Sequence, residues 1–371
     1  MSNLLHVSAN IYSCINKTDH NYQIWKELSK GFDKYYLFAR STRNKFELFQ
    51  DDNITLILIP KIINPARIFI FSSFLILFYI KKLGITHILC QSAIFGGIAV
   101  ILAKKIYNIP VMIEIHGEEY FRIMNSRKLH LKLVSNLLIL IYKNADKVRS
   151  LNPYMTQKLY NLGISNNVVE ILNRVNLKIF NKIKTNYQLN DDVFKLVSVG
   201  RFVKEKNYEN LIRYLSKLKF KYHLTLIGGG ELKIKYINVI QDLNQQENVT
   251  LIDWIDQNLF INIIIKSDVY IQSSISEGMP RTILEAMALQ MPILTTSVGS
   301  IKGVIKNEVN GLLVSIQEDD ILSAIQKLYN SQSLRTELAY NARQDVIKKY
   351  EWNLIFEKYR GELKNMNINI N

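Results

Sequence analysis

Residues 273–294 read SSISEGMPRTILEAMALQMPIL and place two glutamates, Glu277 and Glu285, in an otherwise apolar stretch. The opening serine pair is expected to end a strand, EGMP to form a turn, and Pro280 to begin a helix through RTILEAMALQ, because proline suits the first helical position. A strand that leads through a tight turn into a helix is the repeating unit of parallel α/β sheets. The stretch therefore predicts such a sheet, with a carboxylate at a strand's carboxyl end.

The same alternation of strand-like and helix-like segments runs along the whole chain. LLHVSA, YYLFAR, ITLILIP, THILCQ, PVMIEIHG, DKVRSLN and VVEIL form a first series, and FKLVSVGR, HLTLIGGG, NVTLIDW, SDVYIQSS, MPILTTSVG and GLLVS form a second. The polar segment from Asn173 to Asp192 separates them. Two series predict two doubly wound α/β domains, which we place at residues 1–173 and 174–349. We expect residues 350–371 to form a helix that packs back on the first domain.

A chain of 371 residues suits two domains, and its charge is uneven. Residues 1–175 carry 22 Lys and Arg against 11 Asp and Glu, whereas the remainder carries 25 against 21. A basic half could face nucleic acid, an anionic membrane or a phosphorylated substrate, or could simply aid solubility. Two cysteines, Cys14 and Cys90, form no disulfide framework and suit a reducing compartment. MSNLLHVSANIYS is interpreted as a first strand, not a signal peptide.

Two apolar runs in the basic half have basic flanks. The run from Ile68 to Ile80 lies between Arg67 and a lysine pair, and the run from Leu133 to Tyr142 follows RKLHLK. The first run has 13 residues, fewer than the ~20 that a helix needs to span a bilayer. Each could be an interfacial helix or a helix buried against the sheet, and the sequence leaves both alternatives open.

Three loops at expected strand ends offer groups that bind ligands. In VGRFVKEKN, Gly200 permits a close turn, and Arg201 and Lys206 could clamp a diphosphate or form a solvated surface pair. In IGGGEL, the N–H groups of Gly229 and Gly230 could hold an anion or a base edge, or the glycines could form a bare turn. SEGMPRTILEA supplies the two carboxylates.

The spacing of the two carboxylates bears on the kind of chemistry. If the segment were helical throughout, eight residues at ~1.5 Å each would separate Glu277 and Glu285 by ~12 Å. Hydrolytic carboxylate pairs require ~5–9.5 Å. The two glutamates are therefore interpreted as hydrogen-bond acceptors for different hydroxylated parts of one ligand.

These motifs together resemble a known family. EGMPRTILEAMA resembles the E-x7-E signature of retaining glycosyltransferases of family 4, VGRFVKEKN resembles their Gly-Arg-x4-Lys loop, and IEIHGEE resembles their His-Gly motif. The resemblance implies a GT-B fold, in which two Rossmann-like domains face each other across a cleft and the second holds a nucleotide-sugar donor. It also implies catalysis without a bound metal, and no Asp-x-Asp or His/Cys cluster is present in the sequence.

Carried over by residue, the resemblance assigns the donor site and the catalytic groups. Arg201 and Lys206 would neutralise the diphosphate beside Gly200, Gly229 and Gly230, and Glu285 would bind the ribose. Glu277, with Gly278, Met279 and Pro280, would hold the transferred sugar. His116 would reach that sugar from the other domain, although a turn histidine satisfied by backbone is the simpler reading. His116, Arg201, Lys206 and Glu277 are thus the expected catalytic set.

The chain also departs from the family's pattern. The first βα loop, NIYSCINKTDHNYQIW, lacks the Gly-Gly pair of many members. Asn173-Arg174 stands where Asn-Gly is common, and Gln290 stands where glycine is usual. These departures affect the expected acceptor geometry and the contacts of the first loop more than the donor site.

The expected activity is transfer, with retention, from a nucleotide sugar to a lipid-linked or membrane-associated saccharide in bacterial capsule, O-antigen or lipopolysaccharide synthesis. We expect the protein in the cytoplasm, peripheral on the inner face of the cell membrane and in contact with anionic lipid. The alternatives are a sugar-nucleotide epimerase or hydrolase of the same architecture, or a non-catalytic membrane-surface protein. Nucleic acid is not an expected partner, because the chain has no aromatic-basic RNA-binding motif.

Overall fold

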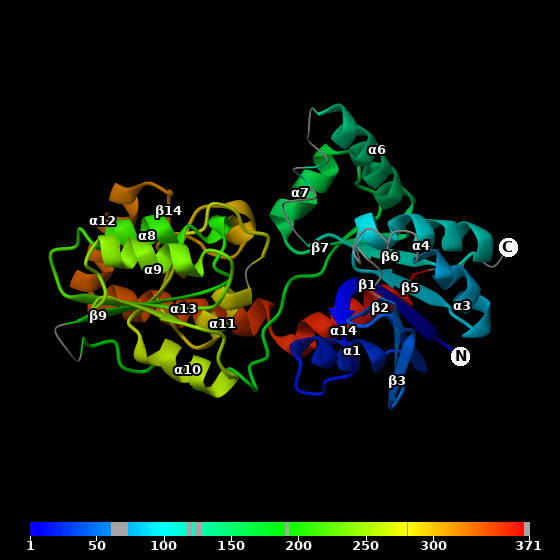
Figure 1. Cartoon of the computed structure of the whole chain (residues 1–371), viewed down its shortest axis with the longest axis horizontal. Helices are drawn as coiled ribbons and strands as arrows, with labels where there is room; N and C mark the ends of the chain where they lie inside the picture. The colour runs from blue at the N-terminus through cyan, green and yellow to red at the C-terminus, as the bar shows by residue number, and fades with distance from the viewer. Residues whose placement is uncertain are drawn as a thin grey trace. The chain divides into compact units, whose positions relative to one another are not determined.

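The structure, a computed structural model, describes residues 1–60, 73–116, 121, 123, 128–189, 193–279 and 281–366. The chain divides into two compact units, each with its own sheet (Figure 1). The first contains residues 1–172 and, from the end of the chain, residues 356–366; the second is Asn173–Ile355.

The first unit contains an eight-stranded sheet in the order β3-β4-β2-β1-β5-β6-β7-β8. All neighbours are parallel except β3 and β4, which form an antiparallel pair. The central strands are buried on both faces, so they are continuous apolar runs. The strands are β1 (Asn3–Tyr12), β2 (Lys34–Ser41), β3 (Glu47–Asp51), β4 (Ile54–Ile59), β5 (His87–Cys90), β6 (Val111–Glu114), β7 (Lys147–Ser150) and β8 (Val168–Glu170).

Helices cover both faces of the first sheet. In Figure 1, α1 and α14 lie on one side of the strands and α4 lies on the other, where it packs against α3 and α6. Asn152 caps α7 by accepting a hydrogen bond from the Met155 N–H at 2.9 Å, with Pro153 as its first residue. The helices are α1 (His20–Ser29), α3 (Ile76–Lys82), α4 (Ala93–Tyr107), α6 (Leu129–Asn144), α7 (Pro153–Asn161) and α14 (Trp352–Lys364), with a 3₁₀ turn at Ser73–Leu75.

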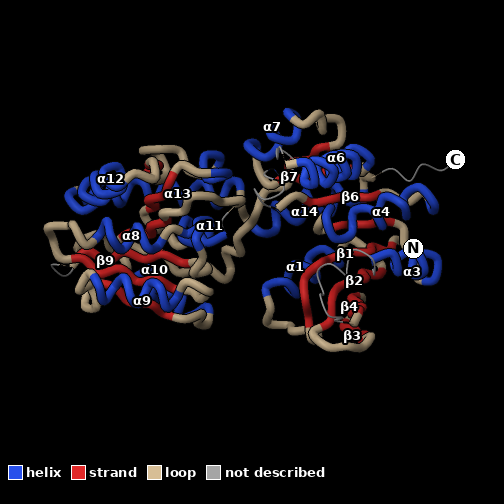
Figure 2. The backbone as a smooth tube through the Cα atoms, turned by 45° about the horizontal axis from the view of Figure 1, so that its top comes forward, coloured by secondary structure: helices blue, strands red, loops and turns tan. Residues whose placement is uncertain are grey.

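The second unit contains a six-stranded sheet, parallel throughout, in the order β11-β10-β9-β12-β13-β14. Figure 2 shows these strands between layers of helices. A buried aromatic group of Phe202, Tyr208 and Tyr236 packs edge to face beneath the loop after β9. The strands are β9 (Phe194–Val199), β10 (Tyr222–Ile227), β11 (Val249–Ile252), β12 (Val269–Gln272), β13 (Ile293–Thr296) and β14 (Leu312–Val314).

The helices of the second unit follow its strands. Asp256 caps α10 and Ser331 caps α13 through their side-chain oxygens. The helices are α8 (Tyr208–Leu215), α9 (Lys233–Asp242), α10 (Gln257–Lys266), α11 (Arg281–Ala288), α12 (Glu318–Asn330) and α13 (Gln332–Lys349), with 3₁₀ turns at Lys204–Lys206 and Gly299–Gly303.

The predicted architecture of two parallel α/β sheets is confirmed, and every predicted strand is present. One strand, β3, was not predicted, because its residues alternate between half-buried and exposed at the sheet's edge. Of the run from Ile68 to Ile80, residues 68–72 lie outside the described residues, and the rest forms the 3₁₀ turn and the start of α3. Within the described part of the chain, no helix is long and apolar enough to cross a membrane.

Candidate functional site

The strand order of the second sheet indicates which two loops are placed to bind a ligand. From β9 the chain moves outward to β10 and β11, whereas from β12 it moves the opposite way to β13 and β14. The strand order therefore reverses between the adjacent strands β9 and β12. In open parallel sheets, ligands bind beyond the carboxyl ends of the strands at such a point. The two loops there carry Lys206, after β9, and Glu277, after β12.

Lys206 and Glu277 form an ion pair across this reversal point. The ammonium of Lys206 donates to Oε1 of Glu277 at 2.7 Å, and both side chains are largely buried, with 15% and 11% exposed. The same oxygen accepts from Nε2 of Gln272 at 2.7 Å and from the hydroxyl of Ser274 at 2.6 Å. Three donors thus fix the Glu277 carboxylate, and all three bind Oε1 and not Oε2.

Backbone contacts hold the two loops together. The N–H of Ile275 donates to the carbonyl of Glu205 at 2.9 Å, and the hydroxyl of Ser273 donates to the carbonyl of Lys206 at 3.1 Å. A third loop supports Glu277 from β13. Gly299 has φ +51°, and a Cβ there would lie 2.0 Å from the carbonyl oxygen of Glu277, so only glycine fits.

Arg201 provides a second cation on the loop after β9. Its side chain is exposed, and the described part of the chain supplies no hydrogen-bond or ion-pair partner for its guanidinium. The exposed guanidinium of Arg201 lies on the same loop as the largely buried ammonium of Lys206. Two such cations can bind a diphosphate, with the guanidinium on one phosphate group and the ammonium on the other.

The glycine turn after β10 packs against the loop that carries Arg201. Gly228 has φ +156°, and a Cβ there would lie 1.9 Å from the carbonyl oxygen of Gly200. The N–H of Phe202 also donates to the carbonyl of Gly229 at 2.8 Å. Gly230 has φ +154°, and a Cβ there would lie 2.7 Å from the carbonyl oxygen of Phe202. Gly228 and Gly230 therefore permit the close approach of two backbones, which puts the glycine turn next to the cation-bearing loop.

Glu285 lies on α11, and in the described part of the chain no group donates a hydrogen bond to its carboxylate. Burial raises its pKa, an effect that the charge of Arg281 partly opposes. Because residues 277–279 are not helical, the expected helical separation of ~12 Å between the two glutamates does not apply. Met279 is buried, its carbonyl accepts from Nδ2 of Asn173 at 3.1 Å, and Gly278 is half-buried; Pro280 lies outside the described residues.

His116 belongs to the first unit and follows β6. Its Nε2 lies 2.9 Å from Oε2 of Glu114, a buried carboxylate that also pairs with Arg149 and accepts a hydrogen bond from the hydroxyl of Tyr359 on α14. The side chain is 37% exposed, and the carboxylate engages Nε2 and not Nδ1. The simpler reading of a turn histidine satisfied by backbone is not what the contacts show, since a carboxylate holds the ring.

The charge of Glu114 is stabilised by its neighbours. Burial would raise the pKa of Glu114, but the charges of His116 and Arg149, with hydrogen bonds from His116 and Tyr359, hold it well below its usual range. His6, buried on β1, binds the hydroxyl of Tyr35 through Nδ1, and among the described residues its Nε2 has no hydrogen-bond partner. Burial lowers the pKa of His6 to about 4, against the opposing charge of Glu114.

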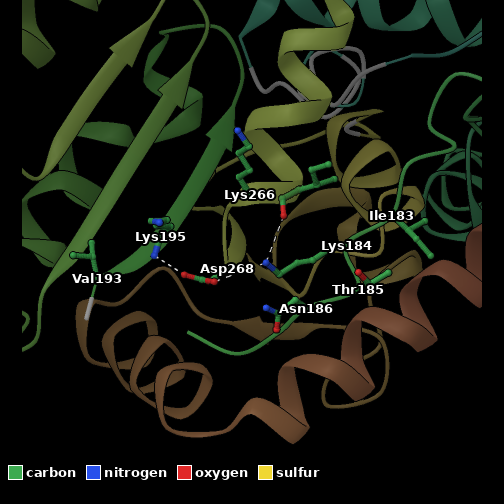
Figure 3. Close-up of a pocket in the computed structure, with 9 residues that line it drawn as sticks. Ile183, Lys184, Thr185, Asn186, Val193, Lys195, Lys266 and Asp268 are labelled. Atoms are coloured by element: carbon green, nitrogen blue, oxygen red, sulfur yellow. Dashed lines mark hydrogen bonds and ion pairs between the residues drawn. The ribbon is translucent and has the colours of Figure 1, made fainter. Parts of the chain in front are cut away.

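A cavity of about 380 Å³ lies at the amino ends of β9 and β12, opposite the strand ends that carry Lys206 and Glu277. Figure 3 shows the ammonium of Lys184 directed toward Asp268, 3.8 Å away, and Asp268 against Lys195 at the start of β9. Burial lowers the pKa of Lys184 and raises that of Asp268. These contacts attach residues 183–186 to the amino ends of β9 and β12, and they are remote from the strand ends that carry Lys206 and Glu277.

Sequence reasoning missed the residues that position the expected ones. Gln272, Ser274 and Gly299 hold Glu277, and Glu114 holds His116. One signal was available, because Glu114 and His116 alternate in IEIH and a carboxylate in an apolar strand needs a cation. Within the described ranges, no group of three His, Cys, Asp or Glu side chains is arranged to hold a metal ion.

Comparison with known proteins gives a family match for the second unit. Residues 179–345 match the model of the family "Glycosyl transferases group 1". This match lies within the second unit and contains Arg201, Lys206, Glu277 and Glu285.

Several curated relatives are glycosyltransferases by name. An uncharacterised glycosyltransferase of Methanocaldococcus jannaschii is 27% identical over 44% of this chain, which spans only 43% of that relative. The capsular polysaccharide biosynthesis glycosyltransferase CapM of Staphylococcus aureus is 27% identical over 72% of this chain and 73% of its own. The lipopolysaccharide core biosynthesis glycosyltransferase LpsE of Rhizobium meliloti is 24% identical over 59% of this chain and 64% of its own.

Solved structures match both units. Sucrose-phosphate synthase of Thermosynechococcus elongatus has a TM-score of 0.80 at 20% identity, over 98% of both chains. Anabaena HepE, solved in complex with UDP, has a TM-score of 0.75 at 14% identity, over 98% of this chain and 100% of its own. The chain has the GT-B fold, and the group 1 match of its second unit supports a glycosyltransferase of that fold.

Proposed function

We propose that the chain is a retaining glycosyltransferase that moves a sugar from a nucleotide-sugar donor to a lipid-linked or membrane-associated saccharide. The observation that carries this proposal is the ion pair of Lys206 and Glu277 at the strand-order reversal of the unit that matches the group 1 family model. Arg201 lies on the same loop as Lys206. Two cations there suit a diphosphate, and a carboxylate fixed beside them suits sugar hydroxyls. The E-x7-E resemblance supports assignment to family 4 and retention.

The donor would bind along the second unit. Arg201 and Lys206 would bind the diphosphate beside Gly200, Gly229 and Gly230, and the unpartnered carboxylate of Glu285 would accept hydrogen bonds from ribose hydroxyls. Glu277, with the N–H groups of Gly278 and Met279, would bind the transferred sugar, and His116 would contribute from the first unit. HepE supports this proposal because it was solved with UDP and with UDP-glucose.

The reaction would need no dedicated nucleophile. The bond between the sugar's anomeric carbon and the phosphate oxygen would break as the acceptor oxygen bonds to that carbon. The departing phosphate would take the proton of the acceptor hydroxyl, and charge would build up on the diphosphate as it leaves. Arg201 and Lys206 would stabilise that charge, which is electrostatic stabilisation of the transition state. We propose that these protein cations act without a bound metal ion.

Synthesis of a bacterial surface polysaccharide is the setting we propose, on the cytoplasmic face of the cell membrane. The names of CapM and LpsE, which refer to capsule and lipopolysaccharide core, support it. A galactosyltransferase of Escherichia coli whose name gives a diphosphoundecaprenol-linked acceptor is 27% identical over 42% of this chain, which supports a lipid-linked acceptor.

The test is a screen of nucleotide sugars against the full chain by thermal shift, followed by transfer assays. A donor at 100 times its Kd should raise the free energy of unfolding by about 2.7 kcal/mol. Nuclear magnetic resonance of the product should show the donor's anomeric configuration. Inversion would exclude retention, and release of free sugar without an acceptor would indicate a hydrolase. Loss of activity with a chelator, restored by a divalent ion, would exclude the metal-free mechanism.

A further inference from the structure

Helices α3 and α4 of the first unit expose large apolar side chains. On α4, Ile98, Leu102 and Ile106 recur every four residues, so they form one stripe along the helix, and all three are exposed. On the adjacent α3, the ring of Phe78 is 68% exposed. The opposite side of α4 packs into the unit through small residues such as Gly96 and Gly97, so the apolar stripe is not part of the core.

Helix α6 continues this surface on the other side of α4. Leu133, Val134, Leu137 and Leu140 are exposed, and Leu133 is 69% exposed. These positions lie on one face of the helix. Because α4 packs against both α3 and α6, the three exposed faces belong to one side of the sheet (Figure 1). An apolar surface of this kind on three neighbouring helices marks an interaction site.

The charge of these helices indicates what binds there. Each carries two lysines, and none of the three contains an aspartate or a glutamate. Lys104 pairs with Asp146, outside the helices, at 2.7 Å. By contrast, α12 of the second unit has Glu318, Asp319 and Asp320 in its first turn. The surface therefore combines exposed apolar side chains with charges of a single sign.

We propose that the exposed face of α3, α4 and α6, hereafter the three-helix face, docks on an anionic lipid bilayer. Apolar side chains would enter the headgroup region, and the lysines would meet lipid phosphates, as in interfacial amphipathic helices. A second copy of the chain suits the face less well, because its lysines would then oppose lysines. The inference rests on the proposed function, since it states where an enzyme with a lipid-linked acceptor meets the membrane.

The experiment is co-sedimentation of the full chain with vesicles. Phosphatidylcholine vesicles with 30 mol% phosphatidylglycerol would be compared with pure phosphatidylcholine. We expect binding to the anionic vesicles that weakens with salt, because charges near the surface are screened within a Debye length. Equal binding to both kinds of vesicle, or no binding, would overturn the proposal.

Matched variants locate the contact. Lys105→Gln/Lys132→Gln should lower vesicle partitioning by about 25-fold, since each lysine contributes about fivefold. Lys219→Gln/Lys221→Gln removes the same charge from the second unit and should bind as the parent does. Leu133→Ser/Leu137→Ser should weaken the binding that remains at high salt. If both lysine pairs lowered partitioning equally, net charge and not the three-helix face would be responsible.

Two further readouts separate this proposal from its alternatives and from the proposed function. Apolar variants that turned a dimer into a monomer in light scattering, with no effect on vesicle binding, would show a protein interface instead and overturn the docking proposal. Donor binding, measured by thermal shift without vesicles, should be unchanged in all these variants. A chain that bound vesicles through this face but no nucleotide sugar would retain the docking site and lose the proposed activity.

Discussion

The ammonium of Lys206 donates a hydrogen bond to the carboxylate of Glu277 at 2.7 Å, although the two residues are 71 positions apart in the chain. In the proposed enzyme the first would bind the diphosphate and the second the sugar. An ion pair between them means that the donor enters a site whose charges already orient each other. Preorganised charge of this kind costs little rearrangement when the transition state forms.

Lys206→Ala should lower kcat/KM by about 10- to 150-fold, because a hydrogen bond to a charged group contributes about 1.5–3 kcal/mol. The loss should appear in kcat as well as in donor affinity, since charge on the leaving group grows in the transition state. Steady-state kinetics with donor and acceptor varied separately would measure it. If only the acceptor KM changed, Lys206 would not bind the diphosphate.

The same substitution should also reduce stability, because it leaves Glu277 largely buried without its cation. The cost should be about 1–3 kcal/mol. Lys206→Met/Glu277→Gln is the matched control, since it removes both charges and should recover stability without recovering activity. If the double variant regained activity, the ion pair would be structural only.

Glu285→Gln should weaken donor binding and leave kcat nearly unchanged, since a ribose contact is remote from the reacting carbon. The parent's affinity should fall as the pH falls, because protonation weakens the carboxylate as an acceptor. Burial raises the pKa of Glu285, so this loss should begin at a higher pH than for an exposed glutamate. Calorimetric titration with UDP between pH 7.5 and 5 would test this, and an equally steep pH dependence in Glu285→Gln would assign it to another group.

Glu114→Gln should loosen the orientation of His116 and destabilise the first unit. Arg149 is 1% exposed and would lose its buried counter-charge, which typically costs about 3–5 kcal/mol. Nuclear magnetic resonance of the imidazole nitrogens should show loss of the tautomer with the proton on Nε2. Glu114→Gln/Arg149→Met should recover part of the stability but not the tautomer. An unchanged tautomer in the single variant would show that Glu114 does not position His116.

His6 should make the first unit less stable in mild acid. Its pKa is lowered to about 4 in the folded chain from 6.5, so the unfolded chain binds a proton that the fold excludes. The free energy of unfolding is therefore at its full value above pH 6.5. It decreases as the pH falls toward 4, by about 3 kcal/mol. Denaturant unfolding followed by the fluorescence of Trp25, with Trp254 and Trp352 replaced by phenylalanine, would measure it. His6→Phe should show a shallower pH dependence, and an equal slope would exclude His6 as the cause.

The sheets were predictable because most of their strands are short apolar runs buried on both faces, and several are followed by a loop with glycine or by a capped helix. The candidate donor residues were predictable because Gly200, Lys206 and Glu277 each sit in a short local motif. What could not be predicted was which side chains touch. Nothing in the sequence places Gln272 and Gly299 around Glu277, because those contacts depend on how three loops pack.

The cluster at Glu114 was missed for the same reason. Its partners Arg149 and Tyr359 come from β7 and from α14, and local periodicity does not indicate that a helix near the chain's end reaches a strand near its middle. Neither the burial of the carboxylate nor its consequence for the pKa of Glu114 can be obtained without that contact.

The position of α14 has a consequence for synthesis on the ribosome. Phe356, Tyr359 and Leu363 are at most 1% exposed within the first unit, so that unit's interior is incomplete until nearly the whole chain has been translated. The second unit, by contrast, has all its residues available once Ile355 has left the exit tunnel. The part of the protein that is made first is therefore finished last, and until then its exposed core surface is open to aggregation.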